Sequence, residues 1–305
     1  MSRTTTPAAR RTKSGRRAQR HGDGAFLTGR TCLVVGGAQG IGWATAVAMA
    51  DHGAVVHVCD VDNDSLARAT EETARLPWPE RLLLARCDAT DRRALEQWIT
   101  EAHIATGRID VLVNNAAFTR WEPVETMSTE EIEQTMAAGY GAMVSATKTV
   151  LPLMRTAGGG HIVTMGSSLG RLYVKGPSAA YCASKAALEA FTTILQIELQ
   201  NSPVHATLIR PGAVAGTGFF QHHVSSQRMP RLADFLPCAT PPDIAHAVLK
   251  ALRRPRATVD IPRFLPALYL SHALFPGTLR RLMETGGPGR RDYGNVRWTH
   301  HLRRS

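Results

Sequence analysis

Tyr181 and Lys185 form the residue pair with the clearest chemical potential, four positions apart in the segment YCASK. In a helix, residues at i and i+4 lie on one face, about 6 Å apart along the axis. A free tyrosine, with a pKa of about 10, is a poor base at neutral pH. A nearby lysine ammonium stabilises the phenolate and lowers that pKa. The pair is therefore suited to moving a proton to or from a substrate oxygen.

A serine precedes this pair at the end of an apolar run. Residues 161–165 (HIVTM) are typical of a buried strand, and Ser167 and Ser168 follow after Gly166. A hydroxyl at this point could hydrogen-bond the carbonyl or alcohol that reacts. Either serine could instead serve only as a turn former, so the residues alone leave the choice open.

A glycine-rich loop follows the first apolar run of the chain. Residues 31–35 (TCLVV) are succeeded by Gly36, Gly40 and Gly42, and then by an Ala-rich segment that favours a helix. A strand that turns sharply into a helix needs glycine wherever backbone N–H groups must approach a phosphate, and the helix N-terminus adds positive potential. The order of strand, glycines and helix predicts a dinucleotide site.

An acidic residue ends the next apolar run. Asp60 follows residues 54–59 (AVVHVC) and is placed to accept hydrogen bonds from both ribose hydroxyls of NAD. The 2′-phosphate of NADP would meet a carboxylate there, and neither Gln39 nor Val61 offers a basic group to bind it. The pattern favours NAD over NADP.

Apolar runs alternate with helix-forming segments along most of the chain. Further strands are expected over residues 81–86, 110–113 and 204–209, with a helix running from Tyr181 to about Leu199 and a long helical stretch before Leu151. Such alternation implies βαβ crossovers around a buried parallel sheet. We expect an α/β protein with a single doubly wound Rossmann-type domain, its parallel β-sheet flanked by helices, over residues 25–288.

At this point the sequence resembles the short-chain dehydrogenase/reductase (SDR) family. The motifs that carry the resemblance occur in the family's order and cover residues 30 to about 217: VVGGAQGIG, CDVD, CDAT, VNNAA, IVTMGSS, YCASK and RPGAV. The resemblance implies an oxidoreductase acting on CH–OH groups, which interconverts a secondary alcohol and a ketone with NAD. It also implies a homo-oligomer. Through the pattern Ser-x-x-Gly, ending at Gly170, it favours Ser167 over Ser168 as the third catalytic residue beside Tyr181 and Lys185.

The resemblance also implies a set of cofactor-binding residues. Asp88 and the amide that follows it would hold the adenine, Asn114 and Asn115 would line the adenosine side, and Val214 would contact the nicotinamide carboxamide through its backbone. The full expected set is Gly36, Gln39, Gly40, Ile41, Gly42, Asp60, Asp88, Asn114, Asn115, Tyr181, Lys185 and Val214.

One departure from the family affects the proton path. Counting back from Leu151 and Pro152, the position of the family's catalytic asparagine falls on Gly139. In the family that asparagine anchors a water relay behind the lysine. Its replacement by glycine leaves open a second interpretation, a non-catalytic NAD-sensing or NAD-binding protein of the same fold.

The net charge of +11 is concentrated at the two ends of the chain. Residues 1–24 hold seven Arg or Lys and one Asp, and residues 289–305 hold five Arg and one Asp, so the middle is nearly neutral. We interpret both ends as solvated basic tails, and expect no specific nucleic-acid partner; loose attraction to anionic lipid or nucleic acid is the alternative. Five scattered cysteines indicate a reducing, cytoplasmic location. No metal-binding motif occurs.

Two segments after residue 215 relate to the substrate. Residues 216–240 form a Gly- and Pro-punctuated stretch that reads either as a lid over an apolar substrate or as an ordinary loop. The apolar run over residues 265–283 is interrupted by Pro266 and Pro276 and is too short to span a bilayer. It could roof the substrate pocket, pack on the core, or make a weak contact with a membrane surface. We expect a small, lipophilic alcohol or ketone as substrate.

Overall fold

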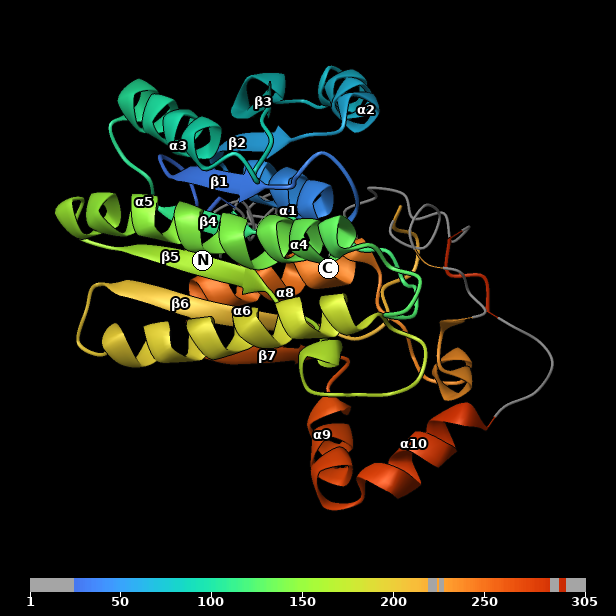
Figure 1. Cartoon of the computed structure of the whole chain (residues 1–305). Coiled ribbons are helices and arrows are strands. Elements are labelled where there is room, and N and C mark those ends of the chain that lie inside the picture. The colour runs from blue at the N-terminus through green and yellow to red at the C-terminus, as the bar shows by residue number, and fades with distance from the viewer. Residues whose placement is uncertain (1–24, 219–223, 225–227, 286–290, 295–305) are drawn as a thin grey trace, which may run out of the picture.

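A seven-stranded parallel sheet forms the centre of the protein, in the order β3-β2-β1-β4-β5-β6-β7. The structure is a computed structural model that describes residues 25–218, 224, 228–285 and 291–294 (Figure 1). The strands are β1 Thr31–Val35, β2 Val55–Asp60, β3 Leu82–Arg86, β4 Val111–Asn114, β5 Gly160–Met165, β6 Val204–Pro211 and β7 Thr258–Ile261. The strand order reverses between β1 and β4, and ligands of doubly wound sheets bind beside such a reversal, at the carboxyl ends of the strands.

Helices cover both faces of the sheet. In Figure 1, α4, α5 and α6 lie in front of the sheet, while α1 and α8 lie behind it. The helices are α1 Gly40–Asp51, α2 Asn63–Thr73, α3 Arg92–Thr106, α4 Thr129–Met136, α5 Ala142–Thr156, α6 Ala179–Glu198, α8 Pro241–Arg253, α9 Leu265–Leu274 and α10 Pro276–Glu284. The expected doubly wound α/β fold is confirmed.

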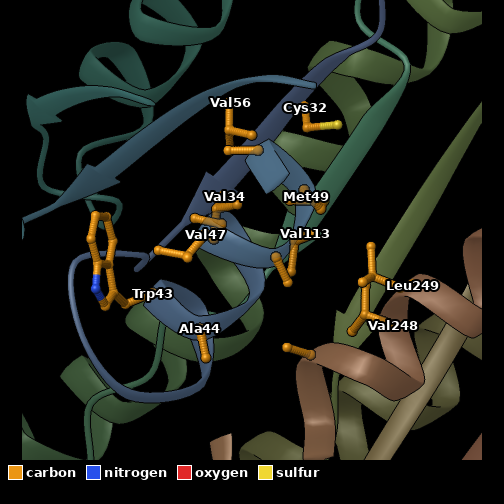
Figure 2. Close-up of a cluster of buried hydrophobic side chains, with 14 of the residues drawn as sticks. Cys32, Val34, Trp43, Ala44, Val47, Met49, Val56, Val113, Val248 and Leu249 are labelled. Atoms are coloured by element: carbon orange, nitrogen blue, oxygen red, sulfur yellow. The ribbon is translucent and has the colours of Figure 1, made fainter. Parts of the chain in front are cut away.

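Strand β1 contributes side chains to two separate hydrophobic cores, one on each face of the sheet. Successive side chains of a strand point to opposite faces of the sheet. Accordingly, Cys32 and Val34 pack in a cluster with residues of α1 and α8, part of which is shown in Figure 2. Leu33 and Val35 pack in a second cluster with residues of α3, α5 and α6. A strand buried on both faces is expected to be apolar throughout, as this one is.

Two elements differ from the sequence prediction. Strand β7 was not expected, because its four residues (TVDI) include Asp260 and give too short an apolar signal; pairing with β6 forms it. The long helix expected before Leu151 is divided into α4 and α5 by a π-helical turn, Ala137–Gly141. Single-turn π-bulges inside helices are frequent at functional sites. Among the described residues, none of the helices has the length and apolar character needed to cross a membrane.

Candidate functional site

The glycine loop brings two backbone segments into close contact. A Cβ atom on Gly36 would lie 2.5 Å from the Cα of Ala116, and its φ of +72° belongs to the left-handed region that favours glycine. A Cβ atom on Gly42 would collide with the carbonyl oxygen of Gly36. The loop after β1 and the segment after β4 therefore need glycine at both positions to pack together.

The N-terminus of α1 is left open to a ligand. The side chains of Asp62, Asp91, Ser128 and Ser178 cap α2, α3, α4 and α6. The N-cap of α1, Gln39, makes no such side-chain hydrogen bond, and neither do those of α5, α9 and α10; among these four helices, α1 alone follows the glycine loop. The first N–H groups of a helix have no partner within the helix, and with the helix dipole they form an anion site. The absence of a side-chain cap on α1 fits the binding of a pyrophosphate there.

Asp60 lies beside this loop, at the carboxyl end of β2. One carboxylate oxygen accepts a hydrogen bond from the Ala38 backbone N–H at 3.0 Å, and the other accepts from the Asp62 N–H at 3.2 Å. Each carboxylate oxygen has a further lone pair. The side chain can therefore still accept hydrogen bonds from a ribose diol.

The two asparagines after β4 have different surroundings. The Asn115 amide donates a hydrogen bond to the Gly36 carbonyl and so ties the segment to the glycine loop. The Asn114 amide nitrogen donates to the Thr147 hydroxyl at 3.3 Å, while its Oδ1 is buried with no hydrogen-bond partner among the described residues. A buried acceptor of this kind is unusual and fits a site completed by a ligand.

The remaining expected cofactor residues lie at the same edge of the sheet. Asp88, just beyond β3, is exposed and accepts hydrogen bonds from the backbone N–H and hydroxyl of Thr90. Val214 follows β6 and forms a parallel bridge with Ala239. Every expected cofactor-binding position is therefore at or near a strand's carboxyl end or on α1 or α6. The combination of glycine cradle, uncapped helix and carboxylate fits a nicotinamide dinucleotide.

Tyr181 and Lys185 lie on one face of α6, both buried. The Lys185 Nζ is 5.7 Å from the centroid of the Tyr181 ring and donates a hydrogen bond to the Met165 carbonyl oxygen at 2.8 Å. Burial raises the pKa of Tyr181 to about 12 and lowers the pKa of Lys185 to about 8. The phenol is protonated at neutral pH, and because burial raises its pKa further, a nearby positive charge is needed to stabilise the phenolate.

Ser167 forms a hydrogen bond with the tyrosine. A hydrogen bond from Ser167 acts on the Tyr181 hydroxyl and lowers its pKa, opposing the larger effect of burial. The Ser167 Oγ also accepts from the Leu169 N–H at 3.2 Å, which fixes it at the start of the 3₁₀ turn Ser168–Gly170. The geometry brings Ser167, Tyr181 and Lys185 together.

Gly139 lies in the π-helical turn and packs against α6. A Cβ atom there would overlap the Oγ of Ser184, the residue next to Lys185. Gly139 also borders a narrow, closely packed gap whose lining includes Asn114 and Met165. As the chain is packed, the position where the family carries asparagine has no room for a side chain unless Ser184 moves.

Aromatic and apolar side chains that the sequence analysis missed cover Tyr181. The Trp121 and Tyr181 ring centroids are 6.2 Å apart, and Met229 and Tyr293 belong to the same buried cluster. Tyr293 is 1% exposed, and its carbonyl oxygen accepts a hydrogen bond from the Gly216 N–H at 2.8 Å. The prediction of a solvated tail from residue 289 is therefore wrong for Tyr293. Residues 1–24 of the N-terminal tail and residues 289–290 and 295–305 of the C-terminal tail lie outside the described residues. So do residues 286–288 and Phe219 and Phe220 of the expected lid.

A largely buried ionic network joins α6 to β6 and β7. Arg210 makes two hydrogen bonds of 2.8 Å with the Asp260 carboxylate and one of 3.0 Å with Glu189, one helical turn beyond Lys185. Arg171, which follows the Ser168–Gly170 turn, pairs with the same Glu189 oxygen. Burial opposes the charge of Arg210, but Asp260 and Glu189 hold its pKa above the usual value. These four charged residues are far apart in the sequence, and no sequence motif predicted that they would form a network.

The fold and these residues define a dinucleotide-binding α/β protein with a Ser–Tyr–Lys constellation. Residues 30–228 match the family described as short chain dehydrogenase. The chain belongs to the short-chain dehydrogenase/reductase family.

Individual relatives support the same conclusion. The chain is 33% identical over 188 residues to oxidoreductase UcpA of Salmonella typhimurium, covering 62% of this chain and 70% of that protein. It is 30% identical over 236 residues to dehydrogenase/reductase SDR family member 11 of Gallus gallus, covering 75% and 92%. A solved SDR structure from Burkholderia phymatum, in complex with NAD, superposes with a TM-score of 0.72 at 20% identity, covering 83% and 96%, which shows a shared fold.

Proposed function

We propose that this protein is an NAD-dependent oxidoreductase that interconverts a secondary alcohol and a ketone on a small, lipophilic substrate. The observation that carries the proposal is the grouping of Ser167, Tyr181 and Lys185 beside the glycine cradle of α1. The bound nicotinamide would supply or accept the hydride. Membership of an oxidoreductase family supports the general class of reaction.

The protein's own residues would handle the proton and the substrate oxygen. In carbonyl reduction, the Tyr181 hydroxyl donates its proton to the substrate oxygen and becomes a phenolate, while the Ser167 hydroxyl hydrogen-bonds the same oxygen. The Lys185 ammonium stabilises the phenolate electrostatically. In alcohol oxidation the same proton returns to Tyr181.

The choice of NAD rests on Asp60. Its carboxylate, 9% exposed and held by the Ala38 and Asp62 amides, would repel a 2′-phosphate. The lipophilic character of the substrate rests on the cluster that covers Tyr181, including Trp121 and Met229. We also propose a homo-oligomer. Ile194 and Ile197 on α6 are each 55% exposed, and a subunit interface would bury them. Light scattering after size exclusion measures the oligomer mass.

The decisive experiment compares wild type with Tyr181→Phe in single-turnover hydride transfer, using a panel of secondary alcohols and ketones with NAD and NADP. We expect loss of turnover in the variant with NAD affinity within a few-fold, because the phenol carries the proton and the glycine loop holds the cofactor. Undiminished turnover would refute the role of Tyr181.

A non-catalytic NAD-binding protein is the second candidate, and the packing of Gly139 against Ser184 is the observation that favours it. In that case wild type binds NAD in calorimetry but gives no hydride transfer with any member of the panel. The same data set therefore separates the two functions.

A further inference from the structure

Large apolar side chains are exposed on α9, on α10 and at the junction between the two helices. Leu270 and Leu274 are 61% exposed, Phe275 is 64% exposed and Leu282 is 49% exposed; we call these four residues the apolar tip. Single exposed apolar residues are ordinary on protein surfaces, whereas a contiguous group marks an interaction site. In Figure 1, α9 and α10 project from the body of the protein, beyond β7.

The inner side of the same two helices is anchored to the body. Leu265, Tyr269, Leu279 and Met283 are buried in one cluster together with Leu172. The Tyr269 hydroxyl also donates a hydrogen bond of 3.1 Å to Asp260 in the ionic network. The two helices are thus held in place by one side while the apolar tip faces away.

The charges next to the apolar tip are mainly positive. Arg280 and Arg281 on α10 are exposed, as is Arg263 just before α9, and Glu284 is the one acidic residue between positions 262 and 285. The Glu284 carboxylate is 4.0 Å from the ammonium of Lys175, which neutralises it. This combination matches the surface of an anionic membrane. Guanidinium groups can pair with the negatively charged headgroups, while the apolar side chains enter the acyl-chain layer below them.

We propose that the apolar tip inserts into the interfacial layer of a membrane that contains anionic phospholipids, with Arg280 and Arg281 at the headgroups. Helix α9 has ten residues and α10 has nine, so the contact is peripheral, since a spanning helix needs about 20. A projecting tip suits insertion into a fluid layer better than docking of a flat protein surface. This contact goes beyond the proposed oxidoreductase function and does not depend on it.

Apolar packing connects this surface with the catalytic region. Leu169, two residues after Ser167, packs against the cluster beneath α9 and α10 and also against the cluster that contains Tyr181. A protein seated through the apolar tip would therefore hold its catalytic tyrosine near the lipid, where lipophilic alcohols and ketones concentrate.

The test is co-sedimentation of the full chain with vesicles of phosphatidylcholine alone or of phosphatidylcholine with phosphatidylglycerol. The variant is Leu274→Glu with Phe275→Glu, and the matched control is Ile104→Glu with Val124→Glu. Ile104 and Val124 are 76% and 65% exposed elsewhere, and both variants change the net charge equally. We expect wild type to bind the mixed vesicles, the tip variant to bind about tenfold more weakly or worse, and the control to bind like wild type.

Three results would overturn the proposal. The first is that wild type does not bind mixed vesicles. The second is that the tip variant and the control lose vesicle binding equally. The third is that light scattering without lipid shows a lower oligomer mass for the tip variant than for wild type. The last result would identify the tip as a subunit interface. Should the tip variant fail to fold by circular dichroism, Arg280→Gln with Arg281→Gln replaces it. That variant is expected to bind mixed vesicles several-fold more weakly, and unchanged binding would again overturn the proposal.

Discussion

The loop after β1, which forms the proposed cofactor side, and the β6–β7 side of the sheet are built by different means. On the cofactor side, backbone packs on backbone: Gly36 and Gly42 leave no room for a Cβ atom against Ala116 and the loop itself. On the β6–β7 side, side chains make the connections. Arg210, Glu189 and Asp260 join α6, β6 and β7 through buried ion pairs.

The difference shows which kind of site tolerates change. A backbone cradle requires one residue type at a fixed spacing, because only glycine permits the approach. A side-chain network can be rebuilt from other residues as long as every buried charge keeps a partner. Substitutions on the two sides should therefore fail for different physical reasons.

The largest effect is expected from Arg210→Met. The substitution leaves the buried carboxylate of Glu189 with Arg171 alone and the half-buried carboxylate of Asp260 with the Tyr269 hydroxyl alone, so we expect a loss of about 2–4 kcal/mol of unfolding free energy. Urea unfolding measures the loss. The control is Arg92→Met, since the exposed pair between Arg92 and Glu96 should contribute nothing measurable. Similar stabilities of the two variants would mean that the network is not an important source of stability.

Gly36→Ala tests the cofactor side. The new Cβ atom meets the Ala116 backbone at 2.5 Å with φ at +72°, so we expect a loss of about 2–4 kcal/mol and of measurable NAD binding in calorimetry. Gly107→Ala is the matched control. Its φ is +74° with nothing within 4 Å of the added atom, which isolates the conformational cost of about 1 kcal/mol. Equal losses would show that the close approach contributes nothing.

Gly139→Ala examines the point where α5 and the π-helical turn meet the catalytic helix. Overlap with the Ser184 Oγ should cost about 1–3 kcal/mol. Adding Ser184→Ala should restore most of it, because the Ser184 Cβ would be 3.7 Å away, an ordinary contact. In the Ser184→Ala background, a gain in kcat for Gly139→Asn and not for Gly139→Ala would support a proton relay at this position. A double variant as unstable as Gly139→Ala alone would contradict the packing argument.

The smallest expected effect is the pH dependence of carbonyl reduction. Burial lowers the pKa of Lys185 to about 8, so the lysine is charged below that pH and loses its charge above it. Tyr181, with its pKa raised to about 12 by burial, stays protonated throughout. Between pH 7 and 9, kcat/KM should fall about tenfold. An arginine stays charged over this range, so a folded Lys185→Arg variant should show a flatter pH profile. If kcat/KM of the variant falls as steeply as in wild type, the decline belongs to the titration of another group.

The sequence by itself predicted the parts of the protein that depend on local pattern. The alternation of apolar strands and helices predicted the doubly wound sheet, because the periodicity of apolar residues along a segment indicates whether it forms a strand or a helix. The grouping of Gly36, Asp60 and Asn114 at one edge also followed, since the carboxyl ends of parallel strands lie together. Tyr181 and Lys185 share a helix face, which needs only the helical repeat.

Only the tertiary structure decided the contacts between distant segments. The meeting of Arg171, Glu189, Arg210 and Asp260, the burial of Tyr293 against Gly216, and the collision that keeps position 139 a glycine all join residues far apart in the chain. No local period marks such pairs, because each depends on how whole strands and helices are placed. Strand β7 belongs with them, since four residues with a central aspartate become a strand only through pairing with β6 and the Arg210 ion pair.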